Sequence, residues 1–266
     1  MGMVEMNDVL EGIRVLLCLT FMVYASWSDF KKREVSNWVW AIFAPTALAL
    51  TSLQFFIFAP ESLYTYALSF VITSALSVTL FYGGAFGGAD AKALMCLSLA
   101  LPAYPVHLLQ PYSDFVSPLF PITVFCNAVI LAALSVLYAV GRNYLWKRKS
   151  GRRLFEGFEG ESSWRKLLVF VSGYKIDISQ LEKKEHLYPL EDFNEDKRKL
   201  LVVPKDEDRS EIVERIQGAE REGKLPNEVW ATPGLPLLVF VTVGLIVALV
   251  YGDIVWAIVR SAFRLS

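Results

Sequence analysis

Two aspartates beside apolar segments are the residues most able to do chemistry in this sequence. Asp29 ends an apolar run and precedes a basic turn that contains Arg33 and Asn37, and Asp90 directly follows the glycine-rich segment 83–89. Carboxyl groups at the edge of a membrane segment are costly and often functional. Neighbouring carboxyl groups cannot both ionise cheaply, so one keeps its proton as an acid while the other draws a proton from water. The pair predicts general acid–base hydrolysis of a peptide carbonyl.

Each aspartate taken singly also fits a structural role. Asp29 could be an interfacial charge, and Asp90 could be a favourable partner for the positive end of a helix dipole. The glycines before Asp90 favour catalysis, because they let the backbone approach a neighbouring helix or a substrate strand closely, which capping does not require. The glycines also predict that the two carboxyl groups stand apart without substrate.

Lys92 is two residues from Asp90, so on a helix it faces elsewhere, as an interfacial lysine would.

Other chemistries lack the residues that they need. Cys18, Cys96 and Cys126 lie far apart in apolar runs, which excludes a disulfide framework and the paired ligands of a structural zinc site. His107 and His186 do not lie near a nucleophile motif. The sequence therefore predicts no metal ion, no cofactor and no Ser-His or Cys-His catalysis.

The elements that position the aspartates are revealed by the distribution of charge. Residues 142–233 carry 19 of the 26 Lys and Arg residues and 18 of the 27 Asp and Glu residues. The mean hydropathy of the whole chain is +0.40 although this segment is strongly charged, so the residues outside it are predominantly apolar. Such a chain is a membrane protein with one soluble insert. The net charge of −1 leaves no basic face for nucleic acid.

Six apolar stretches predict an α-helical polytopic membrane protein with six transmembrane helices, because most of them approach the ~20 residues that a helix needs to cross the hydrocarbon. They are 10–28, 38–59, 63–82, 90–104, 116–141 and 236–259. The expected domains are a membrane domain over 1–141 with helices 1–5, a soluble domain over 142–233, and the sixth helix within 234–266.

The soluble domain between helices 5 and 6 is expected to be a small mixed α/β module. Lys166–Val171 and Leu200–Val203 are β-branched and leucine-rich runs of strand length. Residues 211–222 have apolar side chains at helical spacing.

Orientation follows from the short loops, because basic loops stay in the cytoplasm. Residues 31–33 are basic, whereas the loops 60–62 and 105–115 contain no Lys or Arg. The N-terminus is then external, and the soluble domain and both aspartates are cytoplasmic. Asp253, deep in the sixth helix, is expected near the outer surface and solvated.

The residues around the aspartates resemble a known family. Segment 29–37 looks like the first aspartate motif of the type IV prepilin peptidases, and segment 87–92 looks like the G-x-G-D segment of the GxGD intramembrane aspartyl proteases. Ala89 stands where the second glycine usually stands, and Ser36 where many bacterial members have proline. The resemblance implies that the catalytic residues are Asp29 and Asp90. The supporting motif residues are Gly87, Gly88, Ala89, Lys92, Arg33 and Asn37.

Within that superfamily the chain looks most like the archaeal preflagellin peptidases. The six-helix plan, the entry to the last helix at 232–236 and the lack of cysteine pairs fit that branch. The resemblance implies a multi-pass enzyme of the cell membrane that removes the short basic leader of preflagellin at the cytoplasmic face. Many bacterial prepilin peptidases carry a cysteine-rich zinc domain and also methylate the new N-terminus. Methyltransferase activity is therefore not expected here.

Three other functions remain open. A leader peptidase for archaeal prepilins is the nearest one, so the expected partners are preflagellin or prepilin-like precursors and the lipid bilayer. An ion-coupled carrier would need carboxylates near the bilayer midplane and inverted repeats, and neither is visible in the sequence. A non-catalytic scaffold that recruits a partner through its soluble module would leave the glycines before Asp90 unexplained.

Overall fold

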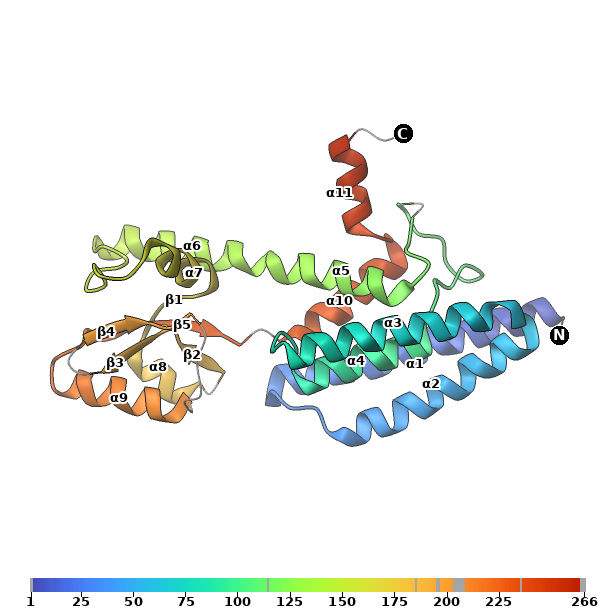
Figure 1. Ribbon diagram of the computed structural model, residues 1–266, viewed down its shortest axis with the longest axis horizontal. Coiled ribbons are helices and arrows are strands. Elements are labelled where there is room, and N and C mark those ends of the chain that lie inside the picture. Colours follow the sequence, from blue (N-terminus) through green and yellow to red (C-terminus); the bar gives the residue numbers. More distant parts are fainter. Residues whose placement is uncertain are drawn as a thin grey trace. The chain divides into compact units, whose positions relative to one another are not determined.

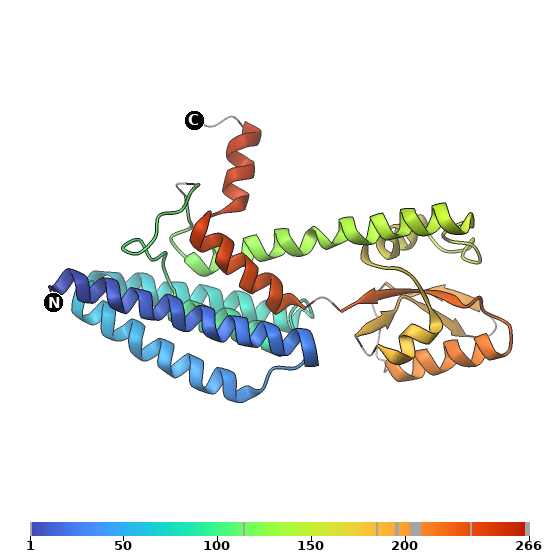
Figure 2. The same ribbon diagram turned by 180° about the vertical axis from the view of Figure 1, so that it is seen from behind.

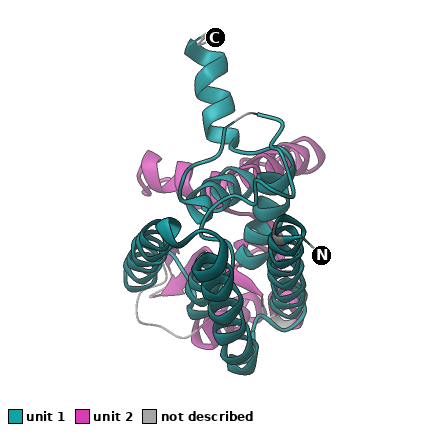
Figure 3. Ribbon diagram, turned by 90° about the vertical axis from the view of Figure 1, so that its right-hand side faces the viewer, with its two compact units in different colours: residues 1–132, 236–266 teal, residues 133–235 magenta. Residues whose placement is uncertain are grey.

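The computed structural model describes residues 2–113, 115–184, 186–194, 197–202, 209–234 and 236–263. The chain forms two compact units (Figure 3). The membrane unit comprises Met1–Ala132 and Pro236–Ser266, and the α/β unit comprises Ala133–Leu235.

The membrane unit is helical (Figure 1). Its elements are α1 (Met3–Lys32), α2 (Asn37–Phe58), the short 3₁₀ helix η1 (Pro60–Ser62), α3 (Leu63–Tyr82), α4 (Gly88–Ala100), α5 (Phe120–Ala133), α10 (Leu237–Val250) and α11 (Ile254–Phe263). Helix α4 packs against α1, α2, α3 and α10. The long helices α1 and α2 lie side by side (Figure 2). Asp90 is therefore carried by a helix that packs against four other helices of this unit.

Close helix packing in the membrane unit depends on a small residue in α10. A Cβ atom at Gly244 would lie 2.8 Å from the backbone nitrogen of Ala128 and 2.8 Å from the carbonyl oxygen of Val124. Real Cβ atoms essentially never come so close, so only glycine lets the backbones of α10 and α5 meet here.

The predicted count of six membrane spans is not confirmed. Among the described residues, four helices are long and apolar enough to cross a membrane, within Val4–Lys32, Asn37–Phe58, Pro60–Tyr82 and Phe120–Ser150. A fifth span results if the bent pair α10 and α11 is counted as one. The fourth predicted helix is only the 13-residue α4. At 1.5 Å per residue such a helix falls short of a hydrocarbon core that is about 30 Å thick.

The last predicted helix, 236–259, is not continuous. Helices α10 and α11 meet at an angle of 62°. At the break, the side-chain amide of Asn127 donates to the carbonyl of Gly252 over 2.8 Å and accepts from the backbone N–H of Ile254 over 2.9 Å.

Asp253 lies at the same break, and the expectation that it is solvated is wrong. Its side chain is buried, with only 7% of the residue exposed. One carboxylate oxygen accepts from the hydroxyl of Thr123 over 3.0 Å, and the other accepts from the backbone N–H of Trp256 over 2.9 Å. Asp253 is therefore a buried cap of α11.

The α/β unit contains the sheet structure of the chain's C-terminal half. Its elements are α6 (Ser135–Ser150), α7 (Ser163–Ser172), β1 (Tyr174–Asp177), α8 (Ile178–Lys183), β2 (Leu187–Pro189), β3 (Glu191–Asn194), β4 (Lys197–Leu200), α9 (Arg209–Arg221) and β5 (Glu228–Pro233). Strand β5 lies between β1 and β2 and is antiparallel to both. Strands β3 and β4 form a separate antiparallel pair.

The local predictions for the α/β unit had mixed outcomes. The predicted helix over 211–222 is confirmed as α9, whose buried face includes Ile212, Ile216 and Ala219. The predicted strand Lys166–Val171 is wrong, because these residues belong to α7, whose first turn is capped by the Ser162 hydroxyl. Of the predicted strand Leu200–Val203, Leu200 ends β4, and Val203 lies outside the described residues.

Candidate active site

Asp29 lies in the last turn of α1, where the helix ends in a tight turn. Arg33 terminates the helix in the left-handed conformation, with φ of 55°, and its backbone N–H donates to the carbonyl of Asp29 over 2.9 Å. The hydroxyl of Ser28 donates to the carbonyl of Glu34 over 2.8 Å and holds the turn. Asp29 is half-buried, and Arg33 is exposed close enough to act on it electrostatically.

Asp90 lies in the first turn of α4. Its carboxylate accepts a hydrogen bond from the backbone N–H of Gly87 over 2.9 Å, as expected of a residue that satisfies a free donor at a helix start. A Cβ atom at position 87 would lie 3.1 Å from the carboxylate oxygen of Asp90. Glycine therefore leaves room for the carboxylate beside the backbone. Gly88 and Ala89, the next two motif residues, are half-buried in the same turn.

The structure brings Asp29 and Asp90 within electrostatic range of each other, although 61 positions separate them in the sequence. Asp90 lies outside the candidate spans, and burial raises its pKa to about 6. The charge of Asp29 raises this pKa further, whereas the hydrogen bond from Gly87 opposes the shift. Among the hydrogen bonds of the described residues, none joins the two carboxyl groups. The pair is coupled by charge without sharing a proton.

Lys92 and Asn37 form a contact that the sequence did not predict. The ammonium group of Lys92 donates to the side-chain carbonyl of Asn37 over 2.7 Å. Asn37 is the first residue of α2, and Lys92 belongs to the second turn of α4. Both residues were expected as supporting motif residues, with Lys92 as an interfacial lysine that faces away from Asp90. The bond between them, which joins the starts of α2 and α4, was not part of that expectation.

Sequence reasoning also missed the contact that fixes α1 one turn before Asp29. The hydroxyl of Ser26 lies 2.6 Å from the hydroxyl of Thr242 in α10 and donates to the carbonyl of Leu238 over 2.8 Å. The sequence contains no specific signal for this contact, because single hydroxyl residues are common in apolar helices and the two partners are more than 200 positions apart.

No group of three or more His, Cys, Asp and Glu side chains that could hold a metal ion occurs within the described part of the chain. Cys18 and Cys96 are buried free thiols of the membrane unit. The charged groups that act on one another at this site are the two carboxyl groups and the cation of Arg33.

Apolar helices of spanning length, a separate α/β unit and two neighbouring aspartates at helix ends define a membrane protein with a paired-carboxyl site. The profile of the type IV leader peptidase family matches residues 16–137, which contain both aspartates. A second profile, that of the archaeal Peptidase A24 C-terminus Type II, matches residues 165–254. Over these two regions the chain is similar to the type IV leader peptidases, and the matches support a membrane peptidase.

Individual relatives are similar over most of their length. The chain is 28% identical to the preflagellin peptidase of Methanococcus voltae over 245 residues, which cover 90% of this chain and 94% of that protein. It is 26% identical to the preflagellin peptidase of Methanocaldococcus jannaschii over 251 residues, which cover 92% of this chain and 96% of that protein. The similarity therefore includes both the membrane unit and the α/β unit.

Proposed function

We propose that this protein is a membrane aspartic endopeptidase that removes the leader peptide from preflagellin at the cytoplasmic face of the membrane. The observation that carries the proposal is the approach of Asp29 and Asp90 from two helices that are far apart in sequence. The names of the relatives, each a preflagellin peptidase, support the choice of substrate.

The proposed chemistry divides the two carboxyl groups into a base and an acid. Asp90, whose pKa is raised to about 6, is the partner that more readily holds a proton. Asp29, the other member of the pair, is assigned as the ionised base and takes a proton from water. The water oxygen bonds to the peptide carbonyl carbon. Asp90 gives its proton to the substrate, and the C–N bond breaks to leave a carboxylic acid and a new amine terminus.

The substrate approaches this pair from the cytoplasmic side in the proposed topology. Lys31 and Lys32 lie in the last turn of α1 and Arg33 caps it, and such a basic helix end favours the cytoplasm. The α/β unit, which contains most of the charged residues, lies on the same side in this proposal. No methyltransferase activity accompanies cleavage.

A purified-component assay tests the function. Detergent-purified protein is mixed with a preflagellin and, separately, with a prepilin, and the products are identified by mass spectrometry. We expect preflagellin to be shortened at its leader, the new N-terminus to be unmethylated, and Asp29→Asn to abolish the product. Asp177→Asn is the matched control, because Asp177 is an exposed residue of the α/β unit.

The same assay separates the alternatives. Efficient cleavage of prepilin alone would mean that the substrate is prepilin and not preflagellin, while the proposed aspartic peptidase chemistry would stand. If neither precursor is cleaved by folded wild-type protein, or if Asp29→Asn cleaves preflagellin normally, then the carrier or scaffold hypothesis replaces the peptidase.

A further inference from the structure

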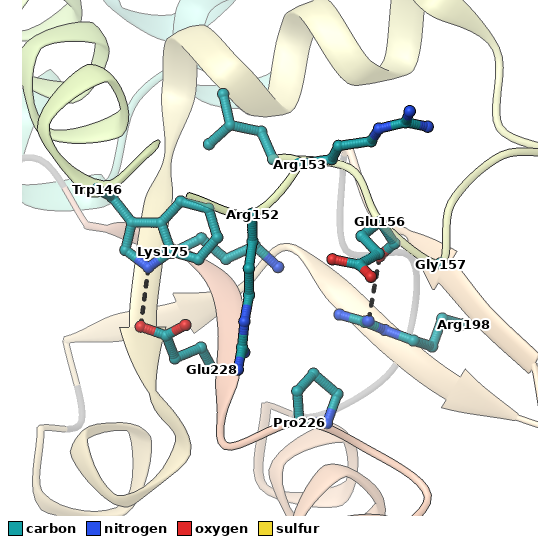
Figure 4. Close-up of a pocket in the computed structure, with 10 residues that line it drawn as sticks. Trp146, Arg152, Arg153, Glu156, Gly157, Lys175, Arg198, Pro226 and Glu228 are labelled. Atoms are coloured by element: carbon teal, nitrogen blue, oxygen red, sulfur yellow. Dashed lines mark hydrogen bonds between the residues drawn. The ribbon is translucent and has the colours of Figure 1, made fainter. Parts of the chain in front are cut away.

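The α/β unit contains a cavity that the peptidase chemistry does not use. Its volume is about 420 Å³, and it lies where the end of α6 and the following turn face β1, β4 and β5 (Figure 4). We call it the cationic pocket. Its charged lining residues are Arg152, Arg153, Lys175, Arg198, Glu156 and Glu228. A cavity of this size is within the range of small-molecule sites.

The deep wall of the cationic pocket contains the buried cation Lys175 and the partly buried cation Arg198, whose side chains are 6% and 12% exposed. A single carboxylate, that of Glu191, contacts both cations, at 2.9 Å from the guanidinium of Arg198 and 3.9 Å from the ammonium group of Lys175. Glu191 also accepts the backbone N–H of Trp230 over 3.1 Å, so its oxygens are already shared. The wall therefore carries a net positive charge that water solvates poorly.

Two further observations indicate that Glu191 alone does not satisfy the cations of this wall. Burial lowers the pKa of Lys175 to about 8; Glu191 opposes this shift, Arg198 adds to it, and Glu228 and Glu156 oppose it to a smaller extent. The buried Nε of Arg198 has no hydrogen-bond partner among the described residues. A buried donor without an acceptor is unfavourable, and a ligand oxygen would relieve this cost.

The rim of the pocket adds two exposed arginines. Arg152 and Arg153 follow the end of α6, and no salt bridge among the described residues involves either of them. The carboxylate of Glu228, on the same rim, accepts from the indole N–H of Trp146 over 2.8 Å (Figure 4). Counting Glu191 behind the deep wall, the pocket has four cations against three carboxylates, and the two rim arginines lie outside the contacts of Glu191.

We propose that the cationic pocket binds the phosphate group of a small phosphorylated molecule or of a lipid headgroup. Guanidinium groups match phosphate oxygens through paired N–H donors, which makes arginine the preferred side chain for this recognition. Arg152 and Arg153 bind from the rim, while Arg198 and Lys175 supply charge from the deep wall. The site is separate from the aspartate pair and does not depend on the proposed cleavage reaction.

Binding is tested on the full-length protein in detergent by isothermal titration calorimetry with pyrophosphate and with inorganic phosphate. We expect saturable binding to the wild type and at least tenfold weaker binding to the double variant Arg152→Gln, Arg153→Gln. Both arginines are exposed, so the variant keeps the fold. The matched control is Arg148→Gln, Lys149→Gln, which removes the same charge from exposed residues of α6 that do not line the pocket.

The source of the phosphate is distinguished by a second readout, the acetylation of Lys175 by acetic anhydride at pH 8, followed by mass spectrometry. Protection by pyrophosphate or a nucleotide in detergent indicates a soluble ligand. Protection only in nanodiscs of phosphatidylglycerol, and not in those of phosphatidylcholine, indicates a lipid headgroup. Absence of binding and protection in every arm would overturn the proposal, as would equal affinity of the wild type and the rim variant.

Discussion

Lys92 donates a hydrogen bond to Asn37 over 2.7 Å and thereby joins the start of α4 to the start of α2. Asp90 lies two residues before Lys92, and Asp29 lies eight residues before Asn37. The bond therefore links the two segments that carry the proposed catalytic pair. We interpret Lys92 and Asn37 as positioning residues, which hold the aspartates at their working separation without touching the reacting atoms.

This interpretation predicts a defect in turnover with little loss of stability. Lys92→Met removes the donor, and because the bond is exposed its loss should cost at most about 1 kcal/mol of unfolding free energy. We expect kcat for preflagellin cleavage to fall roughly threefold to tenfold, with KM little changed, which corresponds to about 0.7 to 1.4 kcal/mol of activation free energy. Lys92→Arg should restore part of the rate, because it keeps a charged donor.

The control for this experiment is Lys183→Met, the same substitution at an exposed position of α8. An unchanged kcat in Lys92→Met, with Tm equal to that of the control, would show that the bond has no part in catalysis.

The aspartate pair predicts complete dependence on both carboxyl groups. Asn keeps the size and polarity of Asp but cannot exchange a proton in the same role, so Asp29→Asn and Asp90→Asn should each lower cleavage by about a thousandfold or more. Residues that act as a unit are not additive, so the double variant should be no slower than either single one. The measurement is the single-turnover cleavage rate of folded, detergent-purified protein.

The raised pKa of Asp90 predicts a particular pH dependence. Asp90 holds its proton below about pH 6 and loses it above, so an acid role makes kcat/KM fall as the pH rises through about 6. The acidic limb arises when the base is protonated, and both limbs belong to the coupled pair. A rate profile that keeps rising from pH 6 to pH 8 would exclude Asp90 as the acid.

Coupling between the two carboxyl groups can be measured without turnover. The charge of Asp29 raises the pKa of Asp90, so Asp29→Asn should lower the pKa of Asp90. Infrared titration of the protonated carboxyl band can detect this change, with Asp177→Asn as the control. Equal pKa values in Asp29→Asn and in the control would mean that the carboxyl groups do not interact.

Local sequence patterns were sufficient to predict helices whose formation depends on residues close together in the chain. The long apolar runs mark α1, α2 and α3, and the spacing of Ile212, Ile216 and Ala219 marks α9. The aspartates stand out because carboxyl groups beside apolar runs are rare. The predicted topology placed both aspartates at the same membrane face, which suggested that they lie close together. In the structure the charge of Asp29 acts on Asp90.

Features that depend on distant residues could not be predicted. The bond between Lys92 and Asn37 spans 55 positions, and the one between Ser26 and Thr242 spans 216. The run Lys166–Val171 has the composition of a strand, but the Ser162 cap favours a helix, and tertiary packing overrides weak β-propensity. The apolar residues on both sides of Gly252 and Asp253 predicted one continuous helix, whereas the break between α10 and α11 depends on polar partners in α5.

That break is the basis of the last prediction. Asp253 accepts from the backbone N–H of Trp256 and from the hydroxyl of Thr123, so Asp253→Ala removes a helix cap and leaves a buried hydroxyl without its acceptor. We expect a loss of about 1 to 2 kcal/mol in unfolding free energy, measured as a lower Tm in detergent. Asp253→Asn keeps one acceptor oxygen for the N–H of Trp256, and its amide can donate to the hydroxyl of Thr123 instead, so this variant should lose less than half as much.

A matched control and the cleavage rate separate this structural role from catalysis. Asp177 precedes α8 as its cap residue but makes no side-chain cap hydrogen bond, so Asp177→Ala should change Tm little. At a temperature where Asp253→Ala is folded, its cleavage rate should be near that of the wild type, unlike the rates of Asp29→Asn and Asp90→Asn. If Asp253→Ala keeps the wild-type Tm but loses cleavage, then Asp253 belongs to the reaction. The assignment of the acid–base pair to Asp29 and Asp90 would then have to be revised.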